Sequence, residues 1–117
     1  MKQNQNIVSV ITPFYNAGKY IEESFLSVIN QKCPKNYTIE YILINDCSTD
    51  NSLEVVNNLI EKYSNISYIN IRLFDLKENL GCGGARKFGI DNSIGKYLMF
   101  LDAIITKEPG KSFLPAA

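Results

Sequence analysis

The chain has 117 residues, of which 45% are apolar and 21% charged, so it can form one domain around a hydrophobic core. Lysine plus arginine number 12 and aspartate plus glutamate number 12, and this zero net charge argues against a nucleic-acid-binding protein. The three cysteines are far apart and histidine is absent, which excludes a zinc-binding spacing. An odd number of cysteines without an export signal favours a reducing compartment.

The chain begins with a polar stretch, residues 1–6, that does not resemble an export signal. No run of about 18 apolar residues, the length needed to cross a bilayer, occurs in the sequence. We therefore expect a cytoplasmic location, in which the protein can also lie at the inner face of a membrane.

A β-branched run, residues 7–12, predicts a buried first strand that Pro13 closes. Asn16 is a suitable cap for a helix over residues 17–31, in which apolar side chains recur at helical spacing. Pro34 prevents this helix from continuing.

The second strand is predicted at residues 38–45, which have a strongly apolar centre. The polar turn 46–51 follows, and a second helix then extends to about Tyr63. Asn51 and Glu54 have the spacing of a capping box at its start.

The rest of the chain repeats this alternation. Residues 66–73 predict a third strand, and residues 75–84 predict a long polar loop. A third helix is expected over residues 85–94, with Gly95 at its C′ position. Residues 97–101 predict a fourth strand.

This element order predicts the α/β class: a Rossmann-like three-layer α/β/α fold with a mostly parallel four-stranded sheet and right-handed crossovers. Ligands bind outside the carboxyl ends of the strands in such sheets. Polar residues follow several of these strands, including Asp46 and Asp102. Residues 1–103 are predicted to form the domain, and residues 104–117, which lack a sustained period, an irregular tail.

Three segments are similar to the successive signatures of family-2 glycosyltransferases with the GT-A fold: residues 8–16 (VSVITPFYN), 45–50 (NDCSTD) and 78–86 (ENLGCGGAR). Leu101-Asp102-Ala103 resembles the start of the fourth signature, an Asp-x-Asp motif. The resemblance implies an incomplete GT-A fold that binds a nucleotide sugar, with a UDP-sugar favoured. It also implies sugar transfer to an acceptor hydroxyl in polysaccharide or glycoconjugate synthesis, where a glycan or lipid-linked glycan is the acceptor.

The resemblance assigns the first two segments to the nucleoside. In the family the first turn lies against the nucleobase, which implies nucleotide contacts for Thr12, Pro13 and Tyr15. Asp46 can accept the imide N–H of uracil, a donor that cytosine lacks, so it favours uridine. Without the resemblance, the first segment is a plain strand-to-helix turn and Asp46 is a cap of the second helix.

The glycine-rich segment borders the nucleotide and the diphosphate in this family, which implies nucleotide contacts for Gly84 and Arg86. Glycine lets the backbone approach a ligand closely, and the forked arginine cation suits phosphate oxygens. The segment is not a dinucleotide fingerprint, because Arg86 stands where the third glycine belongs. The alternative is a flexible surface loop with a solvated arginine.

Asp102 matches the first carboxylate of the Asp-x-Asp motif, which implies contact with the ribose or with the Mg²⁺ or Mn²⁺ ion of the family. Ile104 stands where the second aspartate, the main metal ligand, belongs, and isoleucine cannot bind a metal. We therefore expect metal binding to be weak or absent, with Asp102 as the one predicted ligand. The alternative for Asp102 is a solvated carboxylate at a strand end.

In the family the catalytic general base belongs to a second half of the domain, which we expect this chain to lack, so no catalytic residue is predicted. The chain is expected to be a truncated form that binds UDP weakly and transfers no sugar alone. A fourth strand without further partners would leave an exposed edge, which predicts self-association.

Other functional classes stay open at this stage. A non-catalytic nucleotide-binding module would share the fold and the motifs. A receiver-like doubly wound signalling domain would use Asp46 as phosphoacceptor, although no acidic pair follows the first strand. A nicotinamide dehydrogenase is disfavoured by the incomplete glycine pattern.

Overall fold

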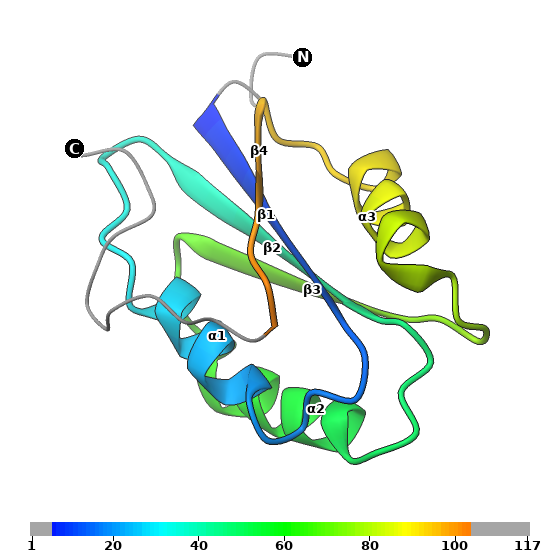
Figure 1. The fold of residues 1–117 in the computed structure, drawn as a ribbon. Coiled ribbons are helices and arrows are strands. Elements are labelled where there is room, and N and C mark those ends of the chain that lie inside the picture. Colours follow the sequence, from blue (N-terminus) through cyan, green and yellow to red (C-terminus); the bar gives the residue numbers. More distant parts are fainter. Residues whose placement is uncertain (1–5, 104–117) are drawn as a thin grey trace.

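The computed structural model describes residues 6–103, which form a three-layer α/β/α sandwich (Figure 1). The sheet consists of four parallel strands in the order β3-β2-β1-β4: β1 (Ile7–Phe14), β2 (Thr38–Asn45), β3 (Ile69–Asp75) and β4 (Tyr97–Phe100). Three helices cover it: α1 (Ile21–Ile29) and α2 (Ser52–Tyr63) on one face, and α3 (Gly81–Asp91) on the other. None of these helices is long and apolar enough to cross a bilayer. The predicted fold class is confirmed.

The sheet has a core on each face because successive strand residues point to opposite sides. The larger core lies under α1 and α2, where Val10 and Tyr41 pack against Phe25. The smaller core lies under α3 and contains Ile11, Ile42, Ile44 and Ala85, with Phe88 and Phe74 against it. Seven of the eight β2 residues are buried, because this strand is central and both of its faces are covered.

Pro13 does not end the first strand, contrary to the prediction. It lies within β1 and pairs with Ile44 of β2. The N–H of Leu101 donates to the Ile11 carbonyl, so the backbone groups of Ile11, and those of Pro13 two residues later, point toward β4. The last residue of β4, Phe100, pairs with Ile11. The missing N–H of Pro13 therefore breaks no bond of the sheet.

The first helix begins at Ile21 rather than at residue 17, and Asn16 does not cap it. Tyr20 occupies the N-cap position and makes no capping bond with its side chain. Asn16 instead has a left-handed backbone, with φ of 51°, and its side chain binds the connection between β2 and α2. Asn16, which the sequence suggested as a helix cap, therefore links the β1–α1 connection to the β2–α2 connection.

The predicted capping box at α2 is also wrong. Asn51 holds the N-cap position, but its side chain makes no capping bond. The neighbouring carboxylate takes this role, because Asp50 Oδ1 accepts a hydrogen bond from the Ser52 N–H at 2.9 Å.

The third helix begins at Gly81 rather than at Ala85, so most of the glycine-rich segment is helix and not loop. Gly95 lies beyond the end of this helix and is not its C′ residue. A Cβ at Gly95 would lie 2.4 Å from Ser9 Oγ and 2.7 Å from the Ile7 carbonyl oxygen. Glycine is needed there because the chain passes directly against β1.

A buried carboxylate joins three strands and the α3–β4 connection. Glu40 of β2 is only 2% exposed and accepts hydrogen bonds from Ser9 Oγ at 2.7 Å and from the Ile94 N–H at 2.9 Å. Its other oxygen lies 2.6 Å from Nη1 of Arg72 on β3, and Nη1 also donates to the Asn92 carbonyl at 2.7 Å. This network lies on the α3 face, and no sequence pattern indicated the partners of Glu40.

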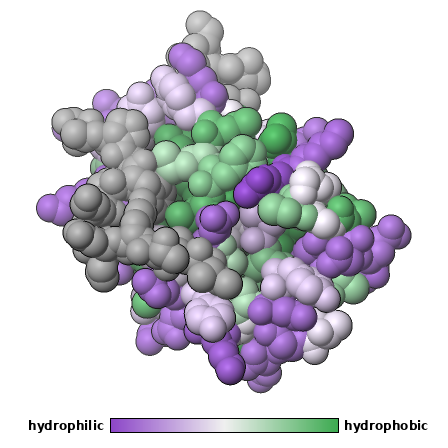
Figure 2. Space-filling model, viewed as in Figure 1, coloured by the Kyte–Doolittle hydropathy of each residue, from purple (hydrophilic) through white to green (hydrophobic). Residues whose placement is uncertain are grey.

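The outermost strand, β4, leaves large side chains exposed. Tyr97, Leu98 and Phe100 are 44–45% exposed. Figure 2 shows hydrophobic residues gathered on this side of the molecule, over β4. Self-association through this edge stays a prediction.

Candidate functional site

Connections from three parts of the chain form a pocket at the carboxyl ends of the strands. Its volume is about 370 Å³, within the range of small-molecule sites, and it is lined by Pro13, Phe14, Tyr15, Asp46, Asn79, Gly81 and Cys82. The end of β1, the start of the β2–α2 connection and the start of α3 each contribute. Parallel strands bring these segments to the same edge of the sheet, as the sequence predicts.

Asp46 is the one carboxylate among the residues that line the pocket, and it is only 4% exposed. Its Oδ1 accepts a hydrogen bond from the Leu80 N–H at 2.7 Å, and its carbonyl accepts one from Asn79 Nδ2 at 3.1 Å. None of the hydrogen bonds within residues 6–103 uses Oδ2. Asp46 therefore anchors the segment before α3 and retains one oxygen that can accept from a ligand.

Four residues of the pocket lining were not among the predicted contacts: Phe14, Asn79, Gly81 and Cys82. Asn79 bonds to the backbone on both sides: Nδ2 reaches the Asp46 carbonyl, and Oδ1 accepts from the Gly81 N–H at 3.0 Å. Its position two residues before Gly81 was the available signal. The side chain of Asn45, in contrast, is directed to Asp75 Oδ1 at 2.9 Å and to the Ser48 N–H at 3.0 Å, so it fixes the strand ends.

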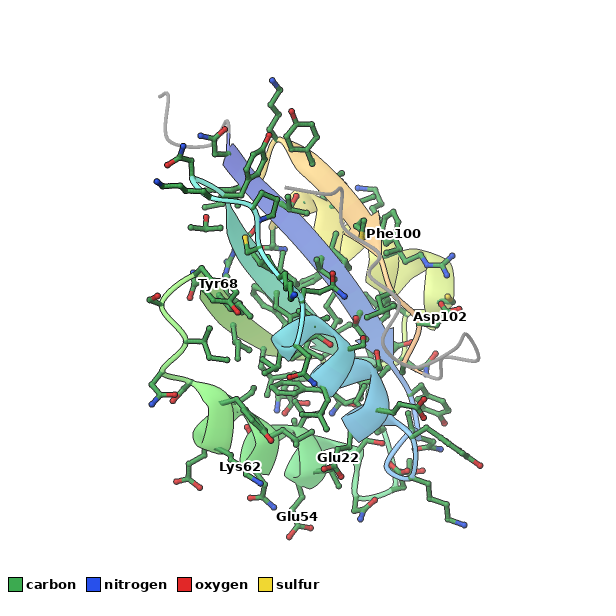
Figure 3. The ribbon with its side chains drawn as sticks, turned by 90° about the vertical axis from the view of Figure 1, so that its left-hand side faces the viewer. Glu22, Glu54, Lys62, Tyr68, Phe100 and Asp102 are labelled. Carbon is green, nitrogen blue, oxygen red and sulfur yellow. The ribbon has the colours of Figure 1, made fainter. Side chains whose placement is uncertain are left out.

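Arg86 and Asp102 face each other across the gap between α3 and the end of β4. Arg86 Nη2 lies 3.6 Å from Asp102 Oδ1, and the guanidinium lies over the Phe100 ring, 5.7 Å from its centroid. Figure 3 shows Phe100 and Asp102 at the end of β4, beside α3. The side chains are 43% and 74% exposed, and an exposed pair of this length contributes about 1 kcal/mol or less, so both groups are available to a ligand. Ser24 Oγ holds the Asp102 carbonyl at 2.8 Å.

The position of Arg86 relative to the pocket follows from α3. Cys82 lines the pocket, and Arg86 lies four residues later on the same face of the helix. Arg86 is thus one helical turn beyond the pocket, on the side of Asp102. The structure places Asp46, Arg86 and Asp102 on one rim of the sheet, and their roles toward a nucleotide stay predictions.

Thr12 and Gly84, like Arg86 and Asp102, are predicted nucleotide contacts that do not line this pocket. Thr12 is fully buried and, like Val10 and Phe14, points to the α1–α2 face of the sheet. Gly84 lies in the first turns of α3, where a Cβ would be 2.8 Å from the Leu80 Cβ. The side chain of Thr12 is thus part of the interior. Gly84 lets α3 pack closely against the Leu80 side chain at its start.

The turn after β1 cannot offer its backbone to phosphate as it does in dinucleotide-binding folds. The N–H groups of residues 16–18 donate in turn to Ser48 Oγ, Ser52 Oγ and Asp50 Oδ2, at 3.0, 2.7 and 3.1 Å. The hydrogen bond from the Ser52 hydroxyl lowers the pKa of Asp50, with further help from backbone N–H groups. A charged carboxylate therefore occupies the place where a phosphate would need these donors.

The described residues do not form a metal site by themselves. Within residues 6–103 no group of three metal-ligating side chains comes together. Asp102 offers one carboxylate, which already faces Arg86. Ile104 lies outside the described residues. Mg²⁺ and Mn²⁺ prefer several oxygen ligands, so a metal here would depend mainly on phosphate oxygens of a ligand.

Comparison with known proteins gives consistent matches over this region. The profile of glycosyl transferase family 2 matches residues 9–103. An uncharacterized glycosyltransferase of Haemophilus influenzae is 39% identical over 100 residues, which are 86% of this chain and 37% of that protein.

Solved structures match the same fold. The structure of TarS from Staphylococcus aureus in complex with UDP-GlcNAc has a TM-score of 0.69 and 36% identity, over 82% of this chain and 26% of that one. The mannosyltransferase PcManGT of Pyrobaculum calidifontis in complex with GDP-Man and Mn²⁺ has a TM-score of 0.73 and 25% identity, over 82% and 27%. The chain thus spans 37% or less of each of these three proteins.

Proposed function

Since the chain belongs to glycosyltransferase family 2, we propose that its pocket holds the nucleoside of a UDP-sugar, as part of an enzyme that transfers the sugar to an acceptor hydroxyl of a glycan. The observation that carries this proposal is the buried carboxylate of Asp46 in a pocket beside Tyr15. The match to TarS in complex with UDP-GlcNAc supports it.

The pocket offers what a uracil base needs. Tyr15 is 50% exposed, so its ring is available for stacking. Oδ2 of Asp46 can accept the imide N–H of uracil, whereas cytosine would present an acceptor to it. A buried group left unpaired costs free energy, so such a site discriminates against the wrong base.

The diphosphate is expected to extend from the pocket toward Arg86. The amides of residues 16–18 are occupied, and the first turn of α1 carries Glu22 and Glu23, which repel phosphate. The first turn of α3 has no acidic residue, and its positive dipole end lies at the pocket. Both features favour a path beside α3, between the ends of β1 and β4, where the strand order reverses.

In the transfer reaction the acceptor oxygen forms a bond to the anomeric carbon as the bond to the diphosphate breaks. The cation of Arg86 stabilises the negative charge that develops on the departing diphosphate. A bound divalent cation would add charge neutralisation, and with Asp102 as its one carboxylate among the described residues we expect a small contribution. The acceptor's proton needs a base that we do not assign to any of residues 6–103, so we expect no useful transfer by this chain alone.

The competing functions fit the structure less well. A receiver domain has the strand order 2-1-3-4-5, whereas the order here is 3-2-1-4. A nicotinamide dehydrogenase needs free amides after β1, and these are occupied. A non-catalytic nucleotide-binding module makes the same prediction for binding and differs only in lacking transfer, which an assay with a radiolabelled UDP-sugar would detect.

Calorimetric titration with UDP tests the proposal. Asp46→Asn keeps an acceptor for Leu80 but removes the charge, so we expect UDP affinity to fall by about tenfold or more. Asp91→Asn is the matched control, because Asp91 is 58% exposed at the far end of α3 and pairs with Lys87. Equal UDP affinities of wild type, Asp46→Asn and Asp91→Asn would contradict the role of Asp46.

A further inference from the structure

We propose that Asn16 is a positioning residue that sets the distance between the two walls of the pocket, an inference that rests on the proposed function. Asn16 Oδ1 accepts three hydrogen bonds from the β2–α2 connection. The donors are the Thr49 N–H at 2.8 Å, the Asp50 N–H at 3.2 Å and Thr49 Oγ1 at 3.3 Å. One side chain thus holds the part of the neighbouring loop that leads into α2.

The same two loops are also bonded in the opposite direction. The N–H groups of residues 16–18 donate to side chains of residues 48–52. We call this reciprocal set of bonds, between residues 16–18 and 48–52, the two-loop clasp. Backbone and side-chain groups of both loops are paired with each other in the clasp, and such pairing restrains the two loops relative to one another.

The clasp lies directly behind both walls of the pocket. Tyr15 is the residue before Asn16, and Asp46 is two residues before Ser48, which binds the Asn16 N–H. Any change in the separation of the two loops would therefore change the separation of Tyr15 and Asp46. A base held between an aromatic ring and a carboxylate needs both at fixed positions, since small misplacements weaken binding strongly.

The backbone of Asn16 supports this role. Its φ of 51° is left-handed, a conformation that asparagine adopts more readily than most residues. Asn16 does not cap α1, so capping does not account for its side chain. The strained backbone and the three accepted bonds are explained together by the contact between the loops.

A pair of variants separates the clasp from the backbone effect. Asn36 also has a left-handed φ, of 74°, and lies in the α1–β2 connection, outside the pocket lining and the clasp. Glycine accepts this left-handed conformation at both sites, so Asn16→Gly and Asn36→Gly should have similar effects on the backbone conformational entropy of the chain. Of the two variants, only Asn16→Gly removes bonds of the clasp, namely the three that the Asn16 side chain accepts.

Two readouts follow: amide hydrogen exchange at Thr49 and Asp50 without ligand, and UDP affinity by calorimetry. In Asn16→Gly we expect faster exchange at both amides and about tenfold weaker UDP binding, with Asn36→Gly like wild type in both. Asn16→Asp keeps the acceptor oxygen, and we expect it to bind UDP within about threefold of wild type, which also covers the case that Asn16→Gly does not fold.

The outcomes are distinguishable. Faster exchange in Asn16→Gly with unchanged UDP affinity would overturn the positioning role and leave the proposed function intact. Asn16→Asp binding UDP about tenfold more weakly than wild type would also overturn it, because the acceptor would then not matter. Absence of UDP binding by the wild-type chain would remove the proposed function, and this inference with it.

Discussion

Replacing Gly89 by alanine tests how closely α3 packs on the sheet that carries the site. Gly89 is buried and faces β1 and β2. A Cβ there would lie 2.6 Å from Ile11 Cγ2 and 2.9 Å from Ile44 Cδ1, and both isoleucines are fully buried. Ile11 Cγ2 is attached to a stiff, β-branched carbon, so the helix itself has to move outward.

A matched variant isolates this packing term. Gly83 lies in the same helix, and a Cβ there would have no atom within 4 Å. Alanine gains up to about 1 kcal/mol over glycine in a helix at either position. Overpacking at Gly89 costs about 1–3 kcal/mol. Both variants gain the same helix propensity from alanine, so this gain cancels when they are compared. Gly89→Ala should therefore be about 1–3 kcal/mol less stable than Gly83→Ala.

Urea unfolding followed by far-UV circular dichroism measures both variants. We expect the midpoint of Gly83→Ala to equal or exceed that of wild type, and the midpoint of Gly89→Ala to fall below that of Gly83→Ala, with the same slope in urea. Equal stability of the two variants would refute the close packing of α3 on β1 and β2, and with it the placement of Arg86.

Three further variants test other parts of the structure. Glu40→Gln should lower the free energy of unfolding by about 1–3 kcal/mol, measured in urea, because it leaves the Arg72 cation partly buried without its charge partner. The lowered pKa of Asp50 means that its charged form stabilises the fold at pH values above the pKa of the unfolded chain's carboxyl, and that this stability is lost as pH falls through the lower folded pKa. Urea unfolding between pH 5 and pH 2 should therefore show a smaller acid-induced loss in Asp50→Asn than in wild type. Arg86→Ala should weaken UDP binding severalfold in calorimetry but leave uridine binding unchanged, because its cation is expected to contact phosphate alone.

Each of these variants has a control or a contradicting result. Glu61→Gln alters an exposed carboxylate on α2 and should leave stability within about 0.5 kcal/mol of wild type. An equal acid-induced loss in wild type and Asp50→Asn would contradict the assigned cause of the shift. Lys87→Ala removes a neighbouring cation that pairs with Asp91, and it should bind UDP as wild type does. If Arg86→Ala weakened uridine binding, Arg86 would contact the nucleoside, which would contradict the proposal that it contacts only the diphosphate.

The fold and the rim of the site could be predicted because their signals are local. The second strand has its predicted bounds, Thr38–Asn45, since a long apolar run between polar turns leaves few alternatives. Once the strands are parallel, topology alone brings residues that follow them, such as Asp46 and Asp102, to one edge.

Contacts between distant segments explain what the sequence could not show. The glycines of α3 disfavour helix on local propensity, yet the helix starts at Gly81 because Ala85 and Gly89 pack on the sheet. Glu40 is a lone charge in an apolar run, and its partners lie on three other segments. Asn16 has the sequence signature of a cap, and only the neighbouring loop shows why it is not one.

An NMR titration of the ¹⁵N-labelled chain with UDP tests the central claim most directly, because it reports where the nucleotide lies. The account predicts the largest amide shifts at Tyr15, Asp46 and Cys82, with smaller ones extending along α3 to Arg86. Shifts confined to the amino ends of the strands, near Thr38 and Tyr97, would contradict it, as would the absence of shifts at millimolar UDP.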